Sequence, residues 1–351
     1  MNRSKVRDVL AAGFLSHGMR YCGVAMLMMV AIAVVPVSAA TWSVTEIYSQ
    51  DDEHILMFTS TNNATATGSW SVPSGVAPEV QILAIGGGGG GGYAGGGGGA
   101  GGLVFDTYTI PSGVSVLDVQ VGGGGAGGTG TASSETGGHS LFGTLQADGG
   151  GAGGHRLNPG GSGGSGGGAG GTRETSGTNV GGSSTSQGYD GGSAYYDADF
   201  EETRQALGAG GGGAGAVGQS TYPNTTGSSS DRVGDGGIGI AFADPLFGDF
   251  FKTITQSDMT NLLSYAAFLG FAGGGGGGGG QSHEWQAYAV TGYGGGDARR
   301  GNNMAGFPAV PHTGGGGGAG SWNGNGGAGG SGIVFLSYTV PPPKGTVISI
   351  R

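Results

Sequence analysis

The sequence predicts a mainly β domain in which strands from both ends of the chain form a base and glycine tracts fill the middle. Three observations predict this. Glycine makes up 91 of the 351 residues, against a usual share of roughly 7%. Hydrophobic residues reach 36% and charged residues only 10%, which argues against simple disorder because disordered segments are rich in charge and poor in apolar residues. Glycine occurs in unbroken runs and not at every third position, which excludes a collagen helix.

Apolar runs bounded by turn residues predict the strands of the base. In chain order they cover residues 54–60, 69–73, 80–85, 103–110, 114–121, 140–147 and 332–340, with a further candidate at 346–350. Pro-Ser-Gly turns end the second strand and separate the fourth from the fifth. Because strands recur at both ends, we expect one framework that closes by bringing these ends together.

Six glycine tracts separate the strands, at residues 86–102, 122–128, 149–171, 208–218, 273–280 and 314–332. They are either flexible linkers or extended threefold helices, which pack side by side through N–H to C=O bonds because glycine lacks a β-carbon. Ordering one backbone unit costs about 1–2 kcal/mol, and one hydrogen bond returns about 0.5–1.5 kcal/mol. Two tracts alone would stay disordered, whereas several tracts anchored on a β base favour an ordered bundle.

Three inserts interrupt the glycine pattern, at residues 189–207, 238–271 and 282–312. The first is acidic and aromatic, and the third is aromatic with two arginines. The second insert contains the one predicted helix, over residues 249–269, because its apolar residues recur at near-helical spacing. Ser257 or Asp258 would cap the second part, so two short helices are an alternative.

The first 39 residues predict a secretory signal peptide. A basic lead precedes the apolar run 24–35, and small residues fit a cleavage site after Ala39. The apolar run is shorter than the roughly 20 residues that cross a bilayer, which favours cleavage over a membrane anchor. We expect a secreted or cell-surface protein without an integral membrane span after cleavage. The glycine-rich domain then covers residues 40–340, and 341–351 form a C-terminal tail.

The formal net charge is −10. Removing the signal takes away four basic residues and one acidic residue, which leaves 9 basic against 22 acidic residues. An acidic surface repels phosphate backbones, so we expect no nucleic-acid partner. The oligomeric state is left open by the sequence.

The sequence offers no convincing motif for catalysis, a cofactor or a metal. The glycine-rich loops lack the lysine of a P-loop, and the histidines form no H-E-x-x-H pair. The only cysteine, Cys22, falls in the signal. An acidic stretch lacks the spacing of calcium loops and is interpreted as solvated: Asp190, Asp197, Asp199, Glu201 and Glu202. We therefore expect no enzyme and neither cofactor nor metal, with a secreted hydrolase as a remote alternative.

Aromatic residues in polar, glycine-flanked surroundings are the candidate ligand contacts. They are Tyr195, Tyr196, Trp285, Tyr288 and Trp322. Such side chains dominate binding surfaces because they bury much area at little entropic cost. The alternative is that they pack across the end of the bundle.

The arrangement resembles a family of glycine-rich domains found in bacterial surface proteins and in phage tail and tail-tip proteins. The matching features are W-S-V-P-S-G at residues 70–75, a strand entering residues 86–92, the Tyr93 interruption, and residues 137–143 and 329–335. The resemblance implies a jelly-roll-like β-sandwich base that carries polyglycine II helices. Related domains in anaplastic lymphoma-type receptor kinases bind protein ligands, and phage adhesins present receptor-binding loops between their glycine helices. The predicted signal and the long inserts depart from this pattern.

Two functions follow from these observations. The first is a rigid scaffold on which the inserts present a binding surface for a glycan or another protein. The second is a passive matrix or envelope component without a specific ligand. Aromatic side chains exposed together at one end would favour the first function, and burial under the glycine segments would favour the second.

Overall fold

The computed structural model describes residues 40–50, 52–171, 177–196, 207–221, 233–252, 254–266, 268–277, 288–289, 292–299 and 301–341. All of them fall in one unit, Ala40–Arg351. The predicted signal peptide, 1–39, lies outside the described residues. So do residues 197–206 of the first insert, 282–287, 290–291 and 300 of the third insert, and 342–351 of the predicted tail with its strand candidate.

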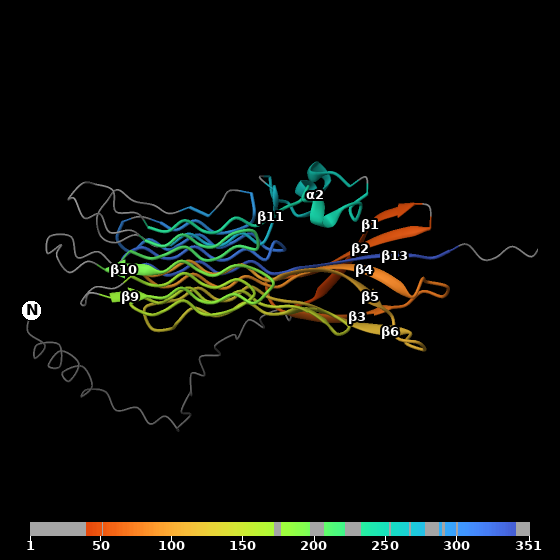
Figure 1. The fold of residues 1–351 in the computed structure, drawn as a ribbon, viewed down its shortest axis with the longest axis horizontal. Helices are drawn as coiled ribbons and strands as arrows, with labels where there is room; N and C mark the ends of the chain where they lie inside the picture. Colours follow the sequence, from red (N-terminus) through yellow and green to blue (C-terminus); the bar gives the residue numbers. More distant parts are fainter. Residues whose placement is uncertain are drawn as a thin grey trace, which may run out of the picture. The chain divides into compact units, whose positions relative to one another are not determined.

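A five-stranded antiparallel sheet joins the two ends of the domain (Figure 1). Its order is β1 (Trp42–Gln50), β2 (Glu53–Ser60), β13 (Ile333–Thr339), β4 (Glu79–Ile85) and β5 (Leu103–Thr109). The last strand lies between β2 and β4, with Val334 opposite both Phe58 and Ala84. The expected closure of the framework by the two ends of the chain is confirmed.

A second antiparallel sheet has the order β3 (Ala66–Ser71), β6 (Val116–Val121), β7 (Ser140–Phe142) and β8 (Leu145–Ala147). The segment 140–147, expected as one strand, is a hairpin because Gly143 turns the chain in the left-handed region at φ +56°. Two short ladders pair β9 (Gly177–Asn179) with β10 (Ala194–Tyr196), and β11 (Ile240–Ala241) with β12 (Gly270–Phe271). The described chain is therefore mainly β.

The central strands of the five-stranded sheet, β2, β13 and β4, are largely buried and contribute to clusters on both faces. One face packs against the four-stranded sheet through a cluster that includes Phe58, Ile82, Trp70 and Phe142. The other face packs against the 238–271 insert, whose Phe251 ring meets Phe335 of β13 edge-on at 5.4 Å. Burial on both faces explains why β13 begins with four consecutive apolar residues, Ile333 to Leu336, instead of alternating.

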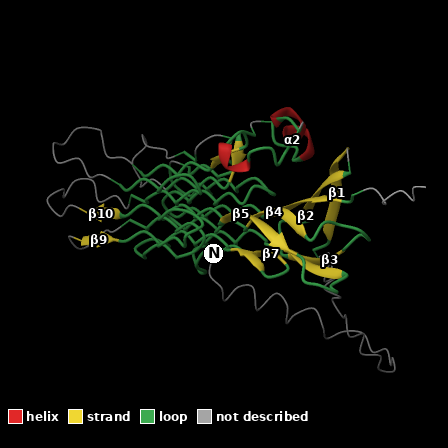
Figure 2. Cartoon of the chain, turned by 45° about the vertical axis from the view of Figure 1, so that its right-hand side comes forward, coloured by secondary structure: helices red, strands yellow, loops and turns green. Residues whose placement is uncertain are grey.

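The predicted helix over 249–269 is wrong in its extent. The described insert holds a single 3-10 turn, η1 (Pro245–Phe247), and one α-helix, α2 (Gln256–Leu262), which Figure 2 shows in red. Thr255 is the N-cap, and Asp258 forms the reciprocal capping box with it instead of acting as the cap. Lys252 and Ser264 adopt positive φ on either side of α2, so the helical conformation cannot extend past them.

The glycine segments run side by side and exchange backbone hydrogen bonds (Figures 1 and 2). The partner of each N–H in the tract 86–92 changes with a period of three. Residues 86, 89 and 92 donate to 102, 99 and 96; residues 87 and 90 donate to 138 and 135; residues 88 and 91 donate to 330 and 327. Donors three residues apart thus reach the same neighbour. The carbonyl oxygens of residues 87–92 accept from three further segments, through the N–H groups of 150 and 153, of 125 and 128, and of 317 and 320, so the tract has six neighbours.

Close approach of these segments requires glycine at many positions. A β-carbon at Gly89 would lie 2.1 Å from the carbonyl oxygen of Gly151. At Gly98 it would lie 2.1 Å from the carbonyl oxygen of Gly89. The spacing between the segments is therefore set by the absence of side chains.

Candidate functional site

Three glycine segments reverse direction at turns that meet at the end of the array remote from the sheets. Residues 86–92 leave β4 and residues 95–102 return to β5, so the turn at Tyr93 lies at the far end of both arms. The turn at Arg156 joins it through Arg156 N–H to Tyr93 O at 3.0 Å. The turn at Trp322 joins it through Ala94 N–H to Gly324 O at 3.2 Å.

Five side chains from these turns form what we call the tip cluster: Tyr93, His155, Arg156, Trp322 and Asn323. The His155 ring stacks on the Tyr93 ring at 5.3 Å between centroids. The Arg156 guanidinium carbon lies 5.2 Å from the Tyr93 ring centroid and 5.7 Å from that of Trp322. Both distances are within the range of cation–π attraction.

Hydrogen bonds orient the tip cluster further. The Asn323 Oδ1 accepts from Arg156 Nη2 at 2.8 Å and from Tyr93 Oη at 3.3 Å. His155 Nε2 lies 3.2 Å from the carbonyl oxygen of Thr129, which requires a proton on Nε2. Two aromatic rings and one amide therefore hold a guanidinium in a fixed orientation.

The tip cluster is accessible. Arg156 and Asn323 are exposed, and Tyr93, His155 and Trp322 are half-buried. Within the described ranges, the ion pairs are His54–Glu46, His139–Asp148 and Lys252–Glu53, so no carboxylate there pairs with Arg156. The cluster thus presents a positive charge beside aromatic surface on a chain whose net charge is negative.

The structure brings one of the five sequence-predicted residues, Trp322, into this cluster. Tyr288 is 55% exposed, and its N–H donates to Asp235 Oδ1 at 2.8 Å. Tyr195 and Tyr196 belong to β10, of which the structure describes the backbone, and Trp285 lies outside the described residues. Of the predicted acidic stretch, Asp190 is described, and its Oδ1 accepts from the N–H and hydroxyl of Ser184.

The sequence analysis missed Tyr93, His155, Arg156 and Asn323. A signal for them was present, because each interrupts a glycine tract. An interruption that follows six to eight residues of mostly glycine, and precedes a similar returning run, places its side chains at the far end of two extended arms. Residues at such midpoints from different tracts then meet at the same end.

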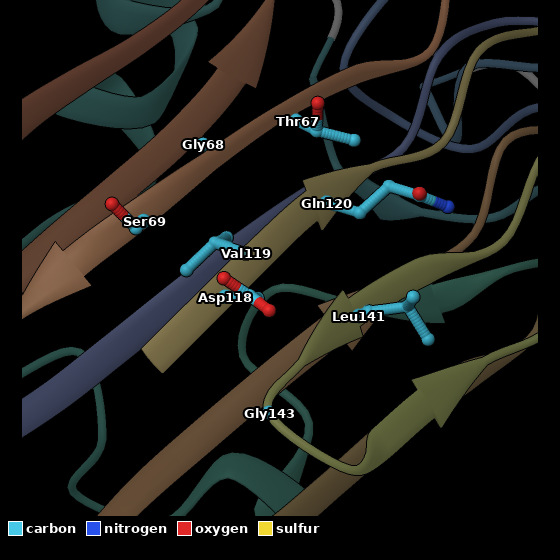
Figure 3. A pocket seen from close by; sticks show the side chains of 8 residues that line it. All are labelled: Thr67, Gly68, Ser69, Asp118, Val119, Gln120, Leu141 and Gly143. Atoms are coloured by element: carbon cyan, nitrogen blue, oxygen red, sulfur yellow. The ribbon is translucent and has the colours of Figure 1, made fainter. Parts of the chain in front are cut away.

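A groove of about 500 Å³ crosses the exposed side of β3, β6 and β7 (Figure 3). Its lining residues are Thr67, Gly68, Ser69, Asp118, Val119, Gln120, Leu141 and Gly143. Thr67 lies opposite Gln120 and Ser69 lies opposite Asp118. No aromatic side chain is among these lining residues, so the groove offers hydrogen-bonding groups without a stacking surface.

The arrangement at His54 bears on the hydrolase alternative. Glu46 Oε1 and Ser49 Oγ both approach the same ring nitrogen, His54 Nδ1, at 2.7 and 3.3 Å. A serine–histidine–acid relay requires the acid and the serine on opposite ring nitrogens. This trio therefore lacks the geometry to activate Ser49.

None of the helices in the described ranges is long and apolar enough to span a membrane. A family model described as glycine-rich domain matches residues 60–339, from the end of β2 to the end of β13. The comparison with curated proteins found no match.

Proposed function

We propose that this chain, which belongs to the glycine-rich domain family, is a secreted or cell-surface scaffold that presents a binding site at the end of a rigid glycine bundle. The observation that carries the proposal is the tip cluster. Three turns that are far apart in sequence place Tyr93, Arg156 and Trp322 in contact at one accessible end.

The hydrogen-bond pattern supports a bundle of polyglycine II helices. Three residues per turn is the period of this helix, and donors in residues 86–92 return to the same neighbour every three residues. A strand inside a sheet bonds to two neighbours, whereas residues 86–92 bond to six. Because each neighbouring segment is hydrogen-bonded to further segments in turn, the bundle resists bending. Its far end is therefore held at a defined distance from the base.

The two antiparallel sheets support the interpretation of the base as a β-sandwich. Side chains of both sheets fill one cluster between them, with Trp70 of β3 5.3 Å from Tyr338 of β13. The 238–271 insert adds a third layer on the outer face of the five-stranded sheet. We therefore assign this insert to stabilising the base and assign ligand contact to the turns of the bundle.

The binding function is favoured over a passive structural role because the tip cluster is accessible. Residues that only held the turns together would gain most from burial, yet Arg156 is exposed and Tyr93 and Trp322 keep part of their surface in water. Partly exposed rings that are fixed in position are typical of recognition surfaces. We also propose that the protein is not an enzyme.

Binding of the purified protein to arrays of glycans and of extracellular matrix proteins tests this function. We expect binding that Trp322→Ala and Tyr93→Ala each weaken by at least about tenfold, as for hot-spot aromatics. Tyr288→Ala is the matched control, since it removes an exposed ring outside the tip cluster. Binding that is unaffected by both tip variants, or absent from every surface, would contradict the proposal.

A further inference from the structure

We infer that the tip cluster recognises an acidic saccharide, with the Arg156 guanidinium binding the anionic group and the adjacent rings contacting the sugar. This inference rests on the proposed display function and names the ligand class of the same site. It follows from how Arg156 is held, from which of its donors are used, and from the surface beside it.

The guanidinium is fixed before any ligand arrives. It lies over the Tyr93 ring at 5.2 Å and over the Trp322 ring at 5.7 Å, while Nη2 donates to Asn323 Oδ1 at 2.8 Å. A free arginine loses side-chain entropy when it binds a ligand. Arg156 has already lost most of this freedom, so little is left to lose on binding.

Most of its hydrogen-bonding capacity is unused. A guanidinium carries five N–H donors in a planar fork, and the one hydrogen bond of the Arg156 side chain among the described residues is that to Asn323. Asn323 is a neutral acceptor, so the charge is not compensated there. Planar two-oxygen anions such as carboxylates match the remaining donors, and sulfate groups match them as well.

The backbone at this position indicates that the side chain matters. Arg156 adopts φ +44°, a left-handed conformation that favours glycine, in a chain with 91 glycines. An arginine here carries backbone strain that a glycine would avoid. Neighbouring rings then supply the second part of the recognition, because the flat faces of sugars pack on aromatic side chains such as those that border the cluster.

The charge distribution favours an anion at this end. The protein is acidic overall, so an acidic polymer is repelled by most of its surface and attracted where an uncompensated cation is exposed. A second guanidinium, that of Arg299, lies 3.9 Å from the Phe307 ring in another turn. Its Nε is buried without a partner among the described residues, and its turn adjoins the tip cluster, because the Asn303 N–H donates to Trp322 O at 2.7 Å.

Titration of the purified protein with four polymers tests the inference: polygalacturonate, dextran sulfate, neutral dextran and poly-L-glutamate. We expect binding of polygalacturonate, of dextran sulfate or of both, with at least about tenfold weaker binding of dextran and of poly-L-glutamate. A preference between the first two distinguishes a carboxylate from a sulfate as the anionic group.

Variants assign the binding to Arg156. Arg156→Gln should reduce the affinity at least about tenfold, and Arg156→Lys should reduce it partly because the ammonium lacks the planar fork. Lys252→Gln removes one positive charge from the base, where the Lys252 ammonium lies 3.4 Å from a Glu53 carboxylate oxygen, and should leave the affinity unchanged. Thermal unfolding of each variant shows whether it is folded, and Asn323→Ala provides an independent variant that loosens the fork without removing charge.

Several outcomes would overturn the inference. Equal affinity for dextran would show that the anionic group is not recognised, while the display function would stand. Equal affinity for poly-L-glutamate would show that the sugar is not recognised. Unchanged affinity of a folded Arg156→Gln variant, or no binding of either acidic saccharide, would also contradict it. The proposed function itself would be contradicted only if binding to the arrays were also absent or unaffected by the tip variants.

Discussion

The indole ring of Trp42 in β1 lies directly against the α-carbon of Gly68 in β3, so that a β-carbon on Gly68 would stand 2.0 Å from Trp42 Cε2. The same indole stacks on Phe58 with centroids 5.9 Å apart and an interplanar angle of 3°. Trp42 therefore occupies a slot between β2 of one sheet and β3 of the other. Gly68 opens that slot because any larger residue would fill it.

Gly68→Ala should destabilise the base, because its methyl group overlaps the Trp42 ring and forces a strand or the indole to move. We expect a loss of about 1–3 kcal/mol in the free energy of unfolding, measured by urea denaturation. Gly130→Ala is the control, since a β-carbon there would meet its nearest neighbour, the Tyr93 ring, at 3.6 Å. Equal effects of the two substitutions would contradict the slot between the sheets.

Gly98→Ala tests the packing of the glycine segments. Its methyl group would lie 2.1 Å from the carbonyl oxygen of Gly89 and separate segments that bond through Gly98 N–H to Gly317 O at 2.9 Å. Since the obstacle is backbone, no side chain can move aside. We expect a loss of more than about 2 kcal/mol in the free energy of unfolding, and a loss below about 0.5 kcal/mol would contradict the packing.

Phe251→Ala tests the role of the 238–271 insert. Phe251 is buried and contacts Phe242, Phe250 and Phe335 at 4.5, 5.0 and 5.4 Å between ring centroids. We expect a loss of about 3–5 kcal/mol in the free energy of unfolding. Leu262→Ala, at a residue 40% exposed on α2, should change it by less than about 1 kcal/mol. Similar small effects of both would show that the insert does not support the sheet.

Asp297→Asn should stabilise the protein at neutral pH. Burial, assisted by the charge of Asp235, raises the pKa of Asp297, although the Ala289 N–H at 2.8 Å opposes this. The folded state thus binds this proton more tightly, so the contribution of Asp297 to stability falls as pH rises through its raised pKa. Asparagine keeps the acceptor and removes the charge. Urea denaturation at about pH 4 and pH 7 should show a gain that grows with pH.

His312 should make the protein less stable on mild acidification. Burial lowers the pKa of His312 below its ordinary value of 6.5, so the unfolded chain binds this proton first. Stability from the neutral ring is therefore present above pH 6.5 and is lost as pH falls toward the lowered pKa. His312→Gln should reduce the slope of stability against pH in this range. An unchanged slope would show that other groups cause it.

Much of the base could be predicted from the sequence, because its strands are strongly apolar and bounded by Pro-Ser-Gly turns. Strand β1 was less evident, since its exposed edge carries polar residues such as Thr45 and Glu46. The helix over 249–269 was predicted too long because its phenylalanines recur at near-helical spacing. They instead converge on the sheet from non-helical backbone at Phe250, Phe251 and Phe268.

The candidate site was only partly predictable, through Trp322. Its partners Tyr93 and Arg156 are separated from it by more than 150 residues, and their contact depends on the lengths of the glycine arms. The number of residues in an arm gives its length in space only once the arm is known to be ordered and extended, and the composition does not show this. Asn63 illustrates the same limit, because its Nδ2 donates to Gly329 O at 2.7 Å although the two residues are 266 positions apart in the sequence.

Amide hydrogen exchange, resolved by segment, tests the central claim most directly, since a rigid bundle requires that the glycine N–H groups be bonded. We expect residues 86–102 and 272–277 to be protected by at least about a hundredfold relative to an unstructured chain, approaching the protection of β13. Exchange of these segments at unstructured rates, with β13 still protected, would show a β base with unbonded glycine tracts and would contradict the account.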